Sequence, residues 1–322
     1  MGSVKDLKII RKPTEAEMGG GVFVFSDRYS IFDYGEMPDH IQGKGEALCL
    51  MAATNFKELE KRGLKTHFIG LGSKTEMKVR LVRKIEPKKL TPESRNCMVP
   101  LEIIFRDALP EGSSVFKRVA KGETTWKDLG LDHEGRPGEK LKAPIIDFST
   151  KFETFDRYFR TIQEVIDYYR LGPERMDEIR KQALAIDKYL REKSAGLGWE
   201  HMDGKVEGAI DSSGELMWVD VFGTLDEDRF ELDGFTLSKQ FLRDYYKRTP
   251  WYAEFMEAKE QNLLEEQWPV PPNLPPELSK LVSDIYKSAC NEWTGERHFE
   301  VRPLRELITN DYQKLKQRGL LE

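Results

Sequence analysis

The stretch HMDGKVEGAIDSSGELMWVDV, residues 201–221, carries charged side chains at alternate positions of what reads as two short strands around a turn. The turn sequence DSSG has the composition of a hairpin loop. Side chains two apart on a strand share a face, so Asp203, Lys205 and Glu207 line up together. The pattern predicts a hairpin with one charged face.

The return strand decides what chemistry this face can do. If the loop has an even number of residues, Asp220 joins the face of Glu207, while Val206 and Val219 point to a core. Carboxylates on adjacent strands suit Mg²⁺, which takes one or two protein carboxylates and completes its shell with water and phosphate oxygens. Lys205 between them can neutralise an anion in the same pocket. A solvated charge ladder with cross-strand pairing explains the spacing equally well.

A second cluster follows an apolar strand in LEIIFRDALPEGSS, residues 101–114. The guanidinium of Arg106, the hydroxyls of Ser113 and Ser114, and a glycine that exposes backbone N–H groups can together cradle a phosphate. A strand exit with a surface arginine explains the same residues. Arg243 in QFLRDYY is likewise either a ligand or a solvated helix residue.

Composition bounds the class of protein. The 322 residues are 39% hydrophobic and 33% charged, and apolar runs such as GVFVF and LEIIF are too short to span a bilayer. The N-terminus lacks the pattern of a signal peptide. Three scattered cysteines without CxxC argue for a reducing compartment and against a zinc site. A net charge of −5 without a basic run disfavours nucleic-acid binding. We therefore expect a soluble cytoplasmic protein that binds neither membrane nor nucleic acid.

The hydrophobic pattern predicts the elements that hold these clusters. Residues 48–59 have helical spacing of apolar side chains, and the polar, glycine-rich stretch 120–142 is expected to be a long loop. Strands and helices come in blocks rather than in strict alternation, which favours an α+β fold. Strands are expected at 21–27, 66–71, 77–85 and 97–105, and further helices at 159–169, 176–190, 237–247 and 278–289.

These stretches, taken in order, resemble the SAICAR synthetase family, the succinocarboxamide synthases of purine biosynthesis. DRYSIFD…DHIQGKG, residues 27–45, is similar to the family's DRISAFD…PIPGKG, and PLEIIFRDALPEGS, residues 100–113, to PLEVVVRxxxxGS. FSTK at 148–151 corresponds to PSTK, the opening hairpin to DFKxEFG…GEIxLxDE, and DEDR at 226–229 to DxxR. The matches are collinear over residues 22–295.

The resemblance implies a fold and a reaction. The fold is the family's α+β arrangement: a small antiparallel β-rich domain at 1–100, a larger α+β domain for substrate and metal at 101–295, and ATP in the cleft between them. ATP would activate the carboxylate of a phosphoribosyl aminoimidazole carboxylate, and the amine of L-aspartate would then displace phosphate. Mg²⁺ is the implied cofactor, since it bridges phosphate oxygens in such transfers. The helical tail at 296–322 and the 120–142 loop could meet a second subunit, giving a homodimer, or simply cap the fold.

The resemblance also implies a role for individual residues. The catalytic set is Lys205, Glu207 and Asp220, of which Glu207 and Asp220 hold Mg²⁺, and Lys205 and Arg229 face substrate carboxylates. The other substrate ligands implied are Arg106, Ser113, Ser114, Lys151 and Arg243. The ATP ligands implied are Lys12, Lys44 and Glu102, with adenine against the strand at 100–102.

Several departures from the family pattern leave alternatives open. RKPTEAEMGGG stands where a glycine- and lysine-containing loop covers ATP phosphates, RYFR at 157–160 replaces an acidic HDEN, DGKVEGA replaces DFKxEFG, and Val221 replaces a glutamate. A paralogous ATP-dependent carboxylate–amine ligase or phosphotransferase with a different acceptor is one alternative. A catalytically inactive nucleotide-binding homologue is the other.

Overall fold

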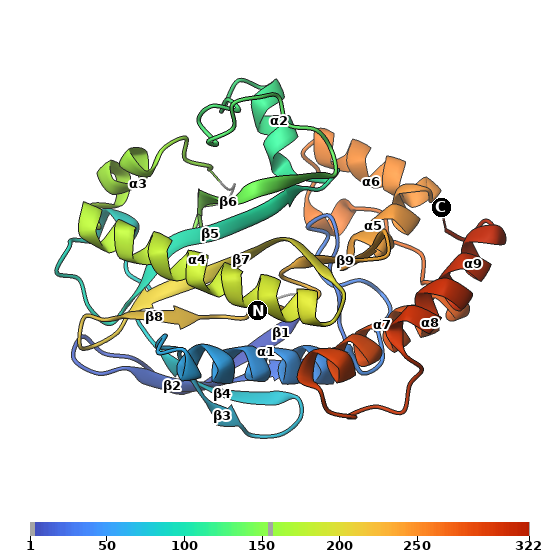
Figure 1. Cartoon of the computed structure of the whole chain (residues 1–322), viewed down its shortest axis with the longest axis horizontal. Helices are drawn as coiled ribbons and strands as arrows, with labels where there is room; N and C mark the ends of the chain where they lie inside the picture. The colour runs from blue at the N-terminus through green and yellow to red at the C-terminus, as the bar shows by residue number, and fades with distance from the viewer. Residues whose placement is uncertain (1–3, 154–156, 322) are drawn as a thin grey trace.

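The computed structural model describes residues 4–153 and 157–321 and shows two antiparallel sheets surrounded by helices (Figure 1). The ends of the expected N-terminal domain and tail, residues 1–3 and 322, lie outside the described residues. The α+β class expected from the sequence is confirmed. No helix among the described residues is long and apolar enough to cross a membrane.

The small sheet is built from the N-terminal part of the chain, in the order β1-β2-β4-β3. Its inner face buries Phe25, Met77 and Val79, and helix α1 packs against it, with Phe56 stacked on Phe68 at 5.8 Å between ring centroids. Its elements are β1 Lys5–Arg11, β2 Gly19–Phe25, α1 Lys44–Lys61, β3 Phe68–Leu71 and β4 Glu76–Leu81.

The large sheet has the order β10-β9-β7-β5-β6, and β8 pairs with the far half of β7. The long helix α4, Pro173–Gly196, lies across it and packs on β5, β6 and β7 (Figure 1). Its strands are β5 Cys97–Leu109, β6 Glu139–Thr150, β7 Glu200–Ile210, β8 Leu216–Val219, β9 Arg229–Leu232 and β10 Phe235–Leu237.

The remaining elements complete the core and the tail. Helix α7 packs on α1, and the C-terminal elements pack on α7, so the tail caps this chain's own fold, while a homodimer stays a prediction. They are η1 Pro87–Lys89, α2 Ser114–Ala120, α3 Ile162–Tyr169, α5 Gln240–Lys247, α6 Pro250–Glu260, η2 Glu265–Gln267, α7 Pro276–Thr294, α8 Leu304–Glu306, the π-helical η3 Leu307–Tyr312, and α9 Gln313–Gln317.

The sequence pattern missed β6, β9, β10, α2 and α6. Helix α2 was not predicted because it begins within the turn-forming sequence PEGSS. Ser113 caps it by accepting a hydrogen bond from the backbone N–H of Val115. Strand β6 begins in a charged, lysine-rich run, so the expected loop at 120–142 ends four residues early, at Gly138. The proposed division at residue 100 falls inside β5 and stays a prediction.

The motif DRYSIFD…QGKG builds the start of α1. The Asp27 carboxylate accepts the backbone N–H groups of Gly43 at 3.1 Å and Gly45 at 3.0 Å, which pairs donors that a helix start leaves free. A Cβ on Gly45 would lie 2.8 to 2.9 Å from the backbone of Ser26, so only glycine fits there. The helix N-terminus is thus already occupied by a protein carboxylate.

Asn55 of α1 joins three helices to the segment that follows β8. Its amide Nδ2 donates to the carbonyls of Phe222 at 2.9 Å and Gly223 at 3.0 Å, and its Oδ1 accepts the Tyr189 hydroxyl at 2.8 Å and the Trp293 indole N–H at 2.7 Å. Asn55 is fully buried, and each partner would be left without a hydrogen bond by its removal.

Replacing Asn55 with leucine should therefore lower the free energy of unfolding by about 3 kcal/mol or more, because several buried polar groups lose their partner at once. Chemical denaturation measures the change. Thr54→Val, at the neighbouring position on the same helix, is the control and should change the free energy by about 0.5 kcal/mol or less. Equal stability of the two variants would show that Asn55 is not a structural link.

Candidate active site

The charged hairpin exists, but its register differs from the sequence expectation. Ile210 pairs with Leu216, so the loop has an odd number of residues and Val219, not Asp220, lies directly opposite Glu207. The condition that placed Asp220 on the shared face is not met, and Val219 shares the face of Glu207 instead of pointing away from it.

Asp220 reaches the site by a backbone turn rather than by strand alternation. It follows β8 with φ of 60°, a left-handed conformation that costs a non-glycine residue free energy. The ring of His67, the residue just before β3 of the small sheet, donates from Nε2 to the Asp220 carbonyl at 3.2 Å. Burial lowers the pKa of His67 to about 4, so this imidazole is neutral. The small sheet thereby fixes the backbone of Asp220.

Glu207 and Asp220 are held close by lysines. Lys5 Nζ lies 2.8 Å from the Asp220 carboxylate, and Lys151 forms an ion pair with Glu207. Burial, together with the charge of Asp220, raises the pKa of Glu207. Burial opposes ionisation of Asp220 as well, but the charges of Lys5 and Lys151 lower its pKa below the ordinary value. The two carboxylates repel each other, and the lysines compensate them.

Lys205 completes this charged cluster, which we define as Lys5, Glu102, Lys151, Lys205, Glu207, Asp220 and Glu227. Its Nζ lies 3.0 Å from Glu102 and 3.6 Å from Glu227. Burial alone would lower the pKa of Lys205, but the charges of Glu227 and Glu102 raise it above its ordinary value. The carboxylates outnumber the ammonium groups by one, and such an oxygen-rich, net-negative site fits a hard divalent cation.

Apolar side chains adjoin the charged cluster on two sides. Leu7 and Ile9 lie on the face of β1 that carries Lys5, and they are 44% and 53% exposed. Val219, opposite Glu207, belongs to a small apolar cluster around buried Ala209 and Met217. The partly buried members of that cluster are Met18, Val82 and Met98. A flat apolar group beside a phosphate chain would suit these surfaces.

The second predicted cluster, Arg106 with Ser113 and Ser114, also forms. Arg106 lies on β5, the strand next to β7. Arg106 is buried and lies 3.1 Å from Asp147, 3.4 Å from the Ser113 hydroxyl and 3.3 Å from the Ser114 hydroxyl. Its Nε has no hydrogen-bond partner among the described residues. Arg118 shares Asp147 with it. Arg106 also lies 3.6 Å from Asp203. Together with Arg229, which pairs with the same Asp203, three guanidinium groups face two carboxylates, so this region is cationic.

Arg229 and Arg243 extend this cationic region, which we call the arginine cluster and define as Arg106, Ser113, Ser114, Arg118, Arg229 and Arg243. Arg229 grips Asp203 with both arms of its guanidinium. Arg243 donates to Gln240 at 3.3 Å, and burial, together with the charge of Arg229, lowers its pKa. Lys239 lies nearby, and burial lowers its pKa too. Cations whose pKa is lowered by burial and by one another are ready to take an anion.

Two predicted ATP ligands do not join the charged cluster. Lys12 lies beyond the opposite end of β1 from Lys5, about 23 Å away along an extended chain. Lys44 is fully buried and pairs with Asp226 at 2.6 Å. The lysine that the sequence analysis missed is Lys5, whose alternation with Leu7 and Ile9 was the available signal. Glu227, inside the DEDR motif, and Lys239, inside the helix expected at 237–247, were missed as well.

The arginines of RYFR have partners on the surface. Arg160 pairs with Asp128 of the 120–142 loop at 2.8 Å, and Arg157 lies over the rings of Phe159 and Tyr168. Of this segment, Tyr158 is the residue that contacts the arginine cluster: its hydroxyl accepts from Ser114 at 3.3 Å. Among the described residues, neither arginine contacts the proposed substrate ligands.

A cavity of about 890 Å³ lies outside both clusters, between residues 84–88 and 167–170. Phe152, next to Lys151, lines it, but no member of the charged cluster does. Its lining includes neither the paired carboxylates Glu207 and Asp220 nor the arginines of the second cluster. We therefore place the chemistry at the two charged clusters rather than in this cavity.

Solved structures with the same fold identify the class. The SAICAR-synthase from Saccharomyces cerevisiae complexed with SAICAR has a TM-score of 0.66 and 20% identity, covering 93% of this chain and 95% of that one. A SAICAR synthetase in complex with ADP has a TM-score of 0.58 and 22% identity, covering 85% and 99%. At these identities the likeness shows the fold, which is that of the SAICAR synthetases.

Sequence comparison gives the family. The SAICAR synthetase family model matches residues 14–258. A protein of Archaeoglobus fulgidus, which carries the name phosphoribosylaminoimidazole-succinocarboxamide synthase provisionally, is 41% identical and covers 96% of this chain and 98% of its own. The enzyme of that name from Thermoplasma acidophilum is 36% identical, covering 86% and 93%. This chain belongs to the SAICAR synthetase family, the ligases of purine biosynthesis, and the alternatives of another acceptor or an inactive homologue are not favoured.

The repulsion between Glu207 and Asp220 has a measurable consequence for stability. A carboxyl group whose pKa is raised by folding destabilises the folded state at any pH above the pKa that the group has in the unfolded chain. At pH 7.5 without ligand, Glu207→Gln should therefore have a free energy of unfolding about 1 kcal/mol above that of the native chain. Its melting temperature should be the same or higher.

Glu215→Gln is the matched control, because Glu215 lies at the turn of the same hairpin and pairs with Lys65 at 2.7 Å. That hydrogen bond lowers the pKa of Glu215, so its loss should not stabilise the protein. A Glu207→Gln protein clearly less stable than the Glu215→Gln protein would contradict the repulsive pair.

Proposed function

We propose that this chain joins L-aspartate to the carboxylate of carboxyaminoimidazole ribonucleotide with consumption of ATP, giving SAICAR, ADP and phosphate. The observation that carries the proposal is the sequence of charges on one strand. Asp203, Lys205 and Glu207 of β7 link the arginine cluster to the paired carboxylates. A phosphorylated substrate and a metal–nucleotide would thereby lie side by side.

The charged cluster is where we place Mg²⁺ and the ATP phosphates. Glu207 and Asp220 would hold the ion, which neutralises charge on the phosphate oxygens when bound. Lys5 and Lys151 already sit on these carboxylates and would turn to the phosphates when the ion takes their place. We place adenine beside Leu7 and Ile9 and the apolar cluster of Val219, instead of against the strand at 100–102 that the resemblance implies, because this place accounts for two exposed apolar side chains.

The arginine cluster is where we place the ribonucleotide. Arg106, Ser113 and Arg243 would bind its ribose phosphate, and Arg229 and Lys205 would orient carboxylates of the two acids. A carboxylate oxygen would then attack the terminal phosphorus and release ADP. The aspartate amine would attack the resulting acyl carbon, lose a proton and release phosphate. Here the protein acts mainly by positioning the groups and neutralising their charge.

We further propose where the nucleotide binds and in which compartment the protein works. The solved relative named as a complex with ADP shares the fold, so we place ADP and ATP at the corresponding junction of the two sheets. Cys49, Cys97 and Cys290 are free and buried, which suits a reducing cytoplasm.

ADP release tests the function. Purified protein with Mg-ATP, carboxyaminoimidazole ribonucleotide and L-aspartate should release ADP, and omission of any one component should abolish release. Release that needs the ribonucleotide but ignores aspartate would contradict the proposed amine. Nucleotide binding without any release would contradict the proposed reaction.

Arg243→Ala tests the ribonucleotide site. Removing this cation should raise KM for the ribonucleotide about ten-fold or more, while KM for ATP changes about two-fold or less, because the lost bond is to a phosphate of one substrate only. Stability should not fall, since Arg243 is a poorly compensated charge. Arg248→Ala is the control, on the exposed end of the same helix. Equal effects on both substrates would remove Arg243 from the site.

A further inference from the structure

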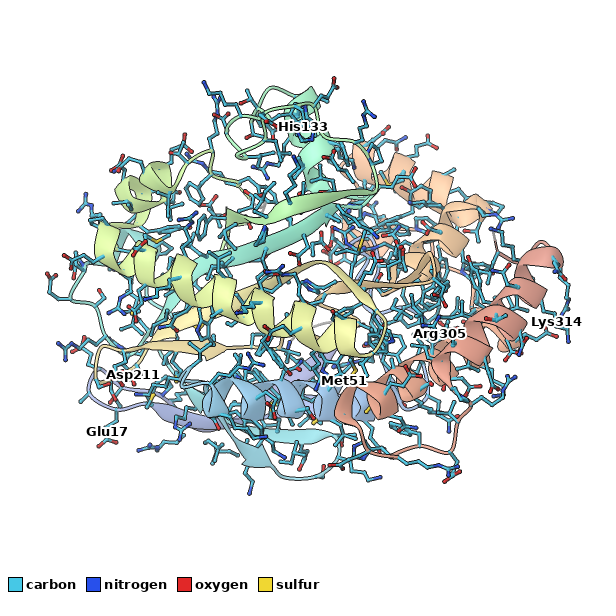
Figure 2. All side chains as sticks on the ribbon, in the orientation of Figure 1. Glu17, Met51, His133, Asp211, Arg305 and Lys314 are labelled. Atoms are coloured by element: carbon cyan, nitrogen blue, oxygen red, sulfur yellow. The ribbon has the colours of Figure 1, made fainter. Side chains whose placement is uncertain are left out.

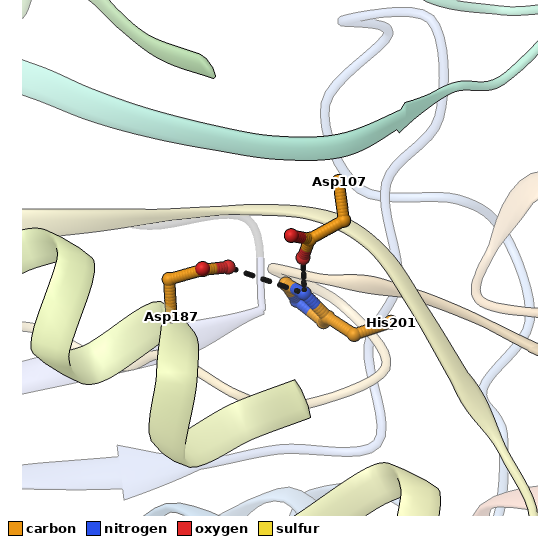
Figure 3. Close-up of side chains that lie close together, drawn as sticks. All are labelled: Asp107, Asp187 and His201. Atoms are coloured by element: carbon orange, nitrogen blue, oxygen red, sulfur yellow. Dashed lines mark hydrogen bonds and ion pairs between the residues drawn. The ribbon is translucent and has the colours of Figure 1, made fainter. Parts of the chain in front are cut away.

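His201 lies at the centre of a buried ionic network beneath the proposed site. Its Nδ1 is 2.7 Å from the Asp107 carboxylate and its Nε2 is 3.0 Å from the Asp228 carboxylate. Asp187 of α4 lies 3.7 Å from Nδ1, and Figure 3 shows Asp107 and Asp187 converging on the imidazole. The side chains of His201, Asp187 and Asp228 are fully buried.

The partners of His201 require it to carry a proton on both nitrogens. Burial raises the pKa of Asp228 to about 6, so its carboxyl group is ionised above neutral pH. Ionised carboxylates only accept hydrogen bonds, so both ring nitrogens donate, which a neutral imidazole cannot do. Arg191 pairs with Asp107 at 3.2 Å and Asp187 at 3.0 Å. A neutral His201 would leave Arg191 alone to balance Asp107 and Asp187, and would leave the buried Asp228 without its cationic partner. Burial lowers the pKa of His201, but its hydrogen bonds to Asp107 and Asp228 raise it to about 10.

Asp228 connects the network to the residues that would bind ligands. Its other oxygen accepts the backbone N–H of Gly223 at 2.5 Å, and its own N–H donates to the Thr224 carbonyl at 2.9 Å. Asp228 therefore closes the segment between β8 and β9, residues 220–229. That segment presents Asp220 at one end and Arg229 at the other.

Gly204 shows that the chain makes room for this network. A Cβ on Gly204 would lie 1.9 Å from the Asp228 carboxylate and 2.7 Å from the ring of Phe105. The resembled family pattern has phenylalanine there, DFK where this chain has DGK. The Asp228 carboxylate that pairs with His201 thus occupies the space that a side chain at position 204 would need, so the chain fits this pair only with glycine there.

We propose that His201 is a buried imidazolium that acts as a positioning residue: through Asp228 it fixes the 220–229 segment and so sets Asp220 and Arg229 for the metal–nucleotide and the ribonucleotide. The consequence for ligands rests on the proposed function. His201 touches neither ligand itself, since both nitrogens are used by protein carboxylates.

A metal ion at Asp107, Asp187 and His201 explains the geometry less well. These ligand atoms lie within 4.8 Å of one another, but Nδ1 points its hydrogen at Asp107, and Arg191 already bridges Asp107 and Asp187. The imidazolium and the guanidinium supply the positive charge that a cation would bring. We therefore infer that His201 and Arg191 balance the charge of these carboxylates, and that the network binds no metal ion.

The protonation state is tested by NMR of the full chain with ring-¹⁵N histidine. His201 should show two protonated ring nitrogens at pH 8.5, where an ordinary histidine is neutral, and these signals should vanish in His201→Leu. His67 is the control, because burial lowers its pKa to about 4 and its ring should show one protonated nitrogen at pH 8.5. The exposed His133, at the edge of the molecule near α2 (Figure 2), pairs with two carboxylates and is therefore not used as the NMR control. A neutral His201 ring at pH 8.5 would overturn the proposal.

Positioning is separated from stability by pairing His201→Leu with the double variant His201→Leu/Asp228→Ser. The single variant leaves Asp228 buried without its partner and should melt well below the native chain. The double variant removes both charges and should recover most of the melting temperature, but calorimetry should still show Mg-ADP bound about ten-fold more weakly, because the segment has lost its anchor. His133→Gln should change neither quantity.

Each outcome decides the proposal. Recovery of both melting temperature and Mg-ADP affinity in the double variant would reduce His201 to a purely structural role. Unchanged Mg-ADP affinity in His201→Leu would overturn positioning altogether. These readouts need no turnover. A native chain that fails to make SAICAR, but has a charged His201 and loses Mg-ADP affinity in both His201 variants, would refute the proposed function while leaving this inference standing.

Discussion

The mutual repulsion of Glu207 and Asp220 is the constraint around which this part of the molecule is organised. Two carboxylates in a buried place cost free energy, and the fold meets that cost with Lys5 from the small sheet and Lys151 from the end of β6. Asp220 sits there in a left-handed conformation that the His67 ring stabilises. Such strain persists only where the surroundings fix it, and it is typical of ligand sites.

The 220–229 segment transmits this constraint to the rest of the fold. Asn55 holds its carbonyls at Phe222 and Gly223, and Asp228 closes it from within. Asp226 of the same segment pairs with buried Lys44 and accepts the Tyr286 hydroxyl at 2.6 Å. The QGKG motif therefore serves the architecture: it begins α1 and ties it to the segment that carries the proposed ligands.

Sequence reasoning found the parts of the site that depend on local pattern. Alternation gave Asp203, Lys205 and Glu207 their common face, and the strand exit of β5 gave Arg106 its serines. Alternation marks the face of β1 that carries Lys5, but not the partner of that face, because only the folded chain brings Lys5 to Asp220. The loop length of the hairpin was equally hidden, so the route of Asp220 to Glu207 was misjudged. Helix α2 was missed because turn formers begin it.

Calorimetric titration of ADP into the purified chain, with and without Mg²⁺, is the most direct measurement of the central claim that Glu207 and Asp220 form a metal–nucleotide site. The account predicts tight binding of ADP only with Mg²⁺ present, and loss of that dependence in Glu207→Gln and Asp220→Asn while both variants remain folded. ADP affinity that is indifferent to Mg²⁺, or a full metal effect in both variants, would contradict it.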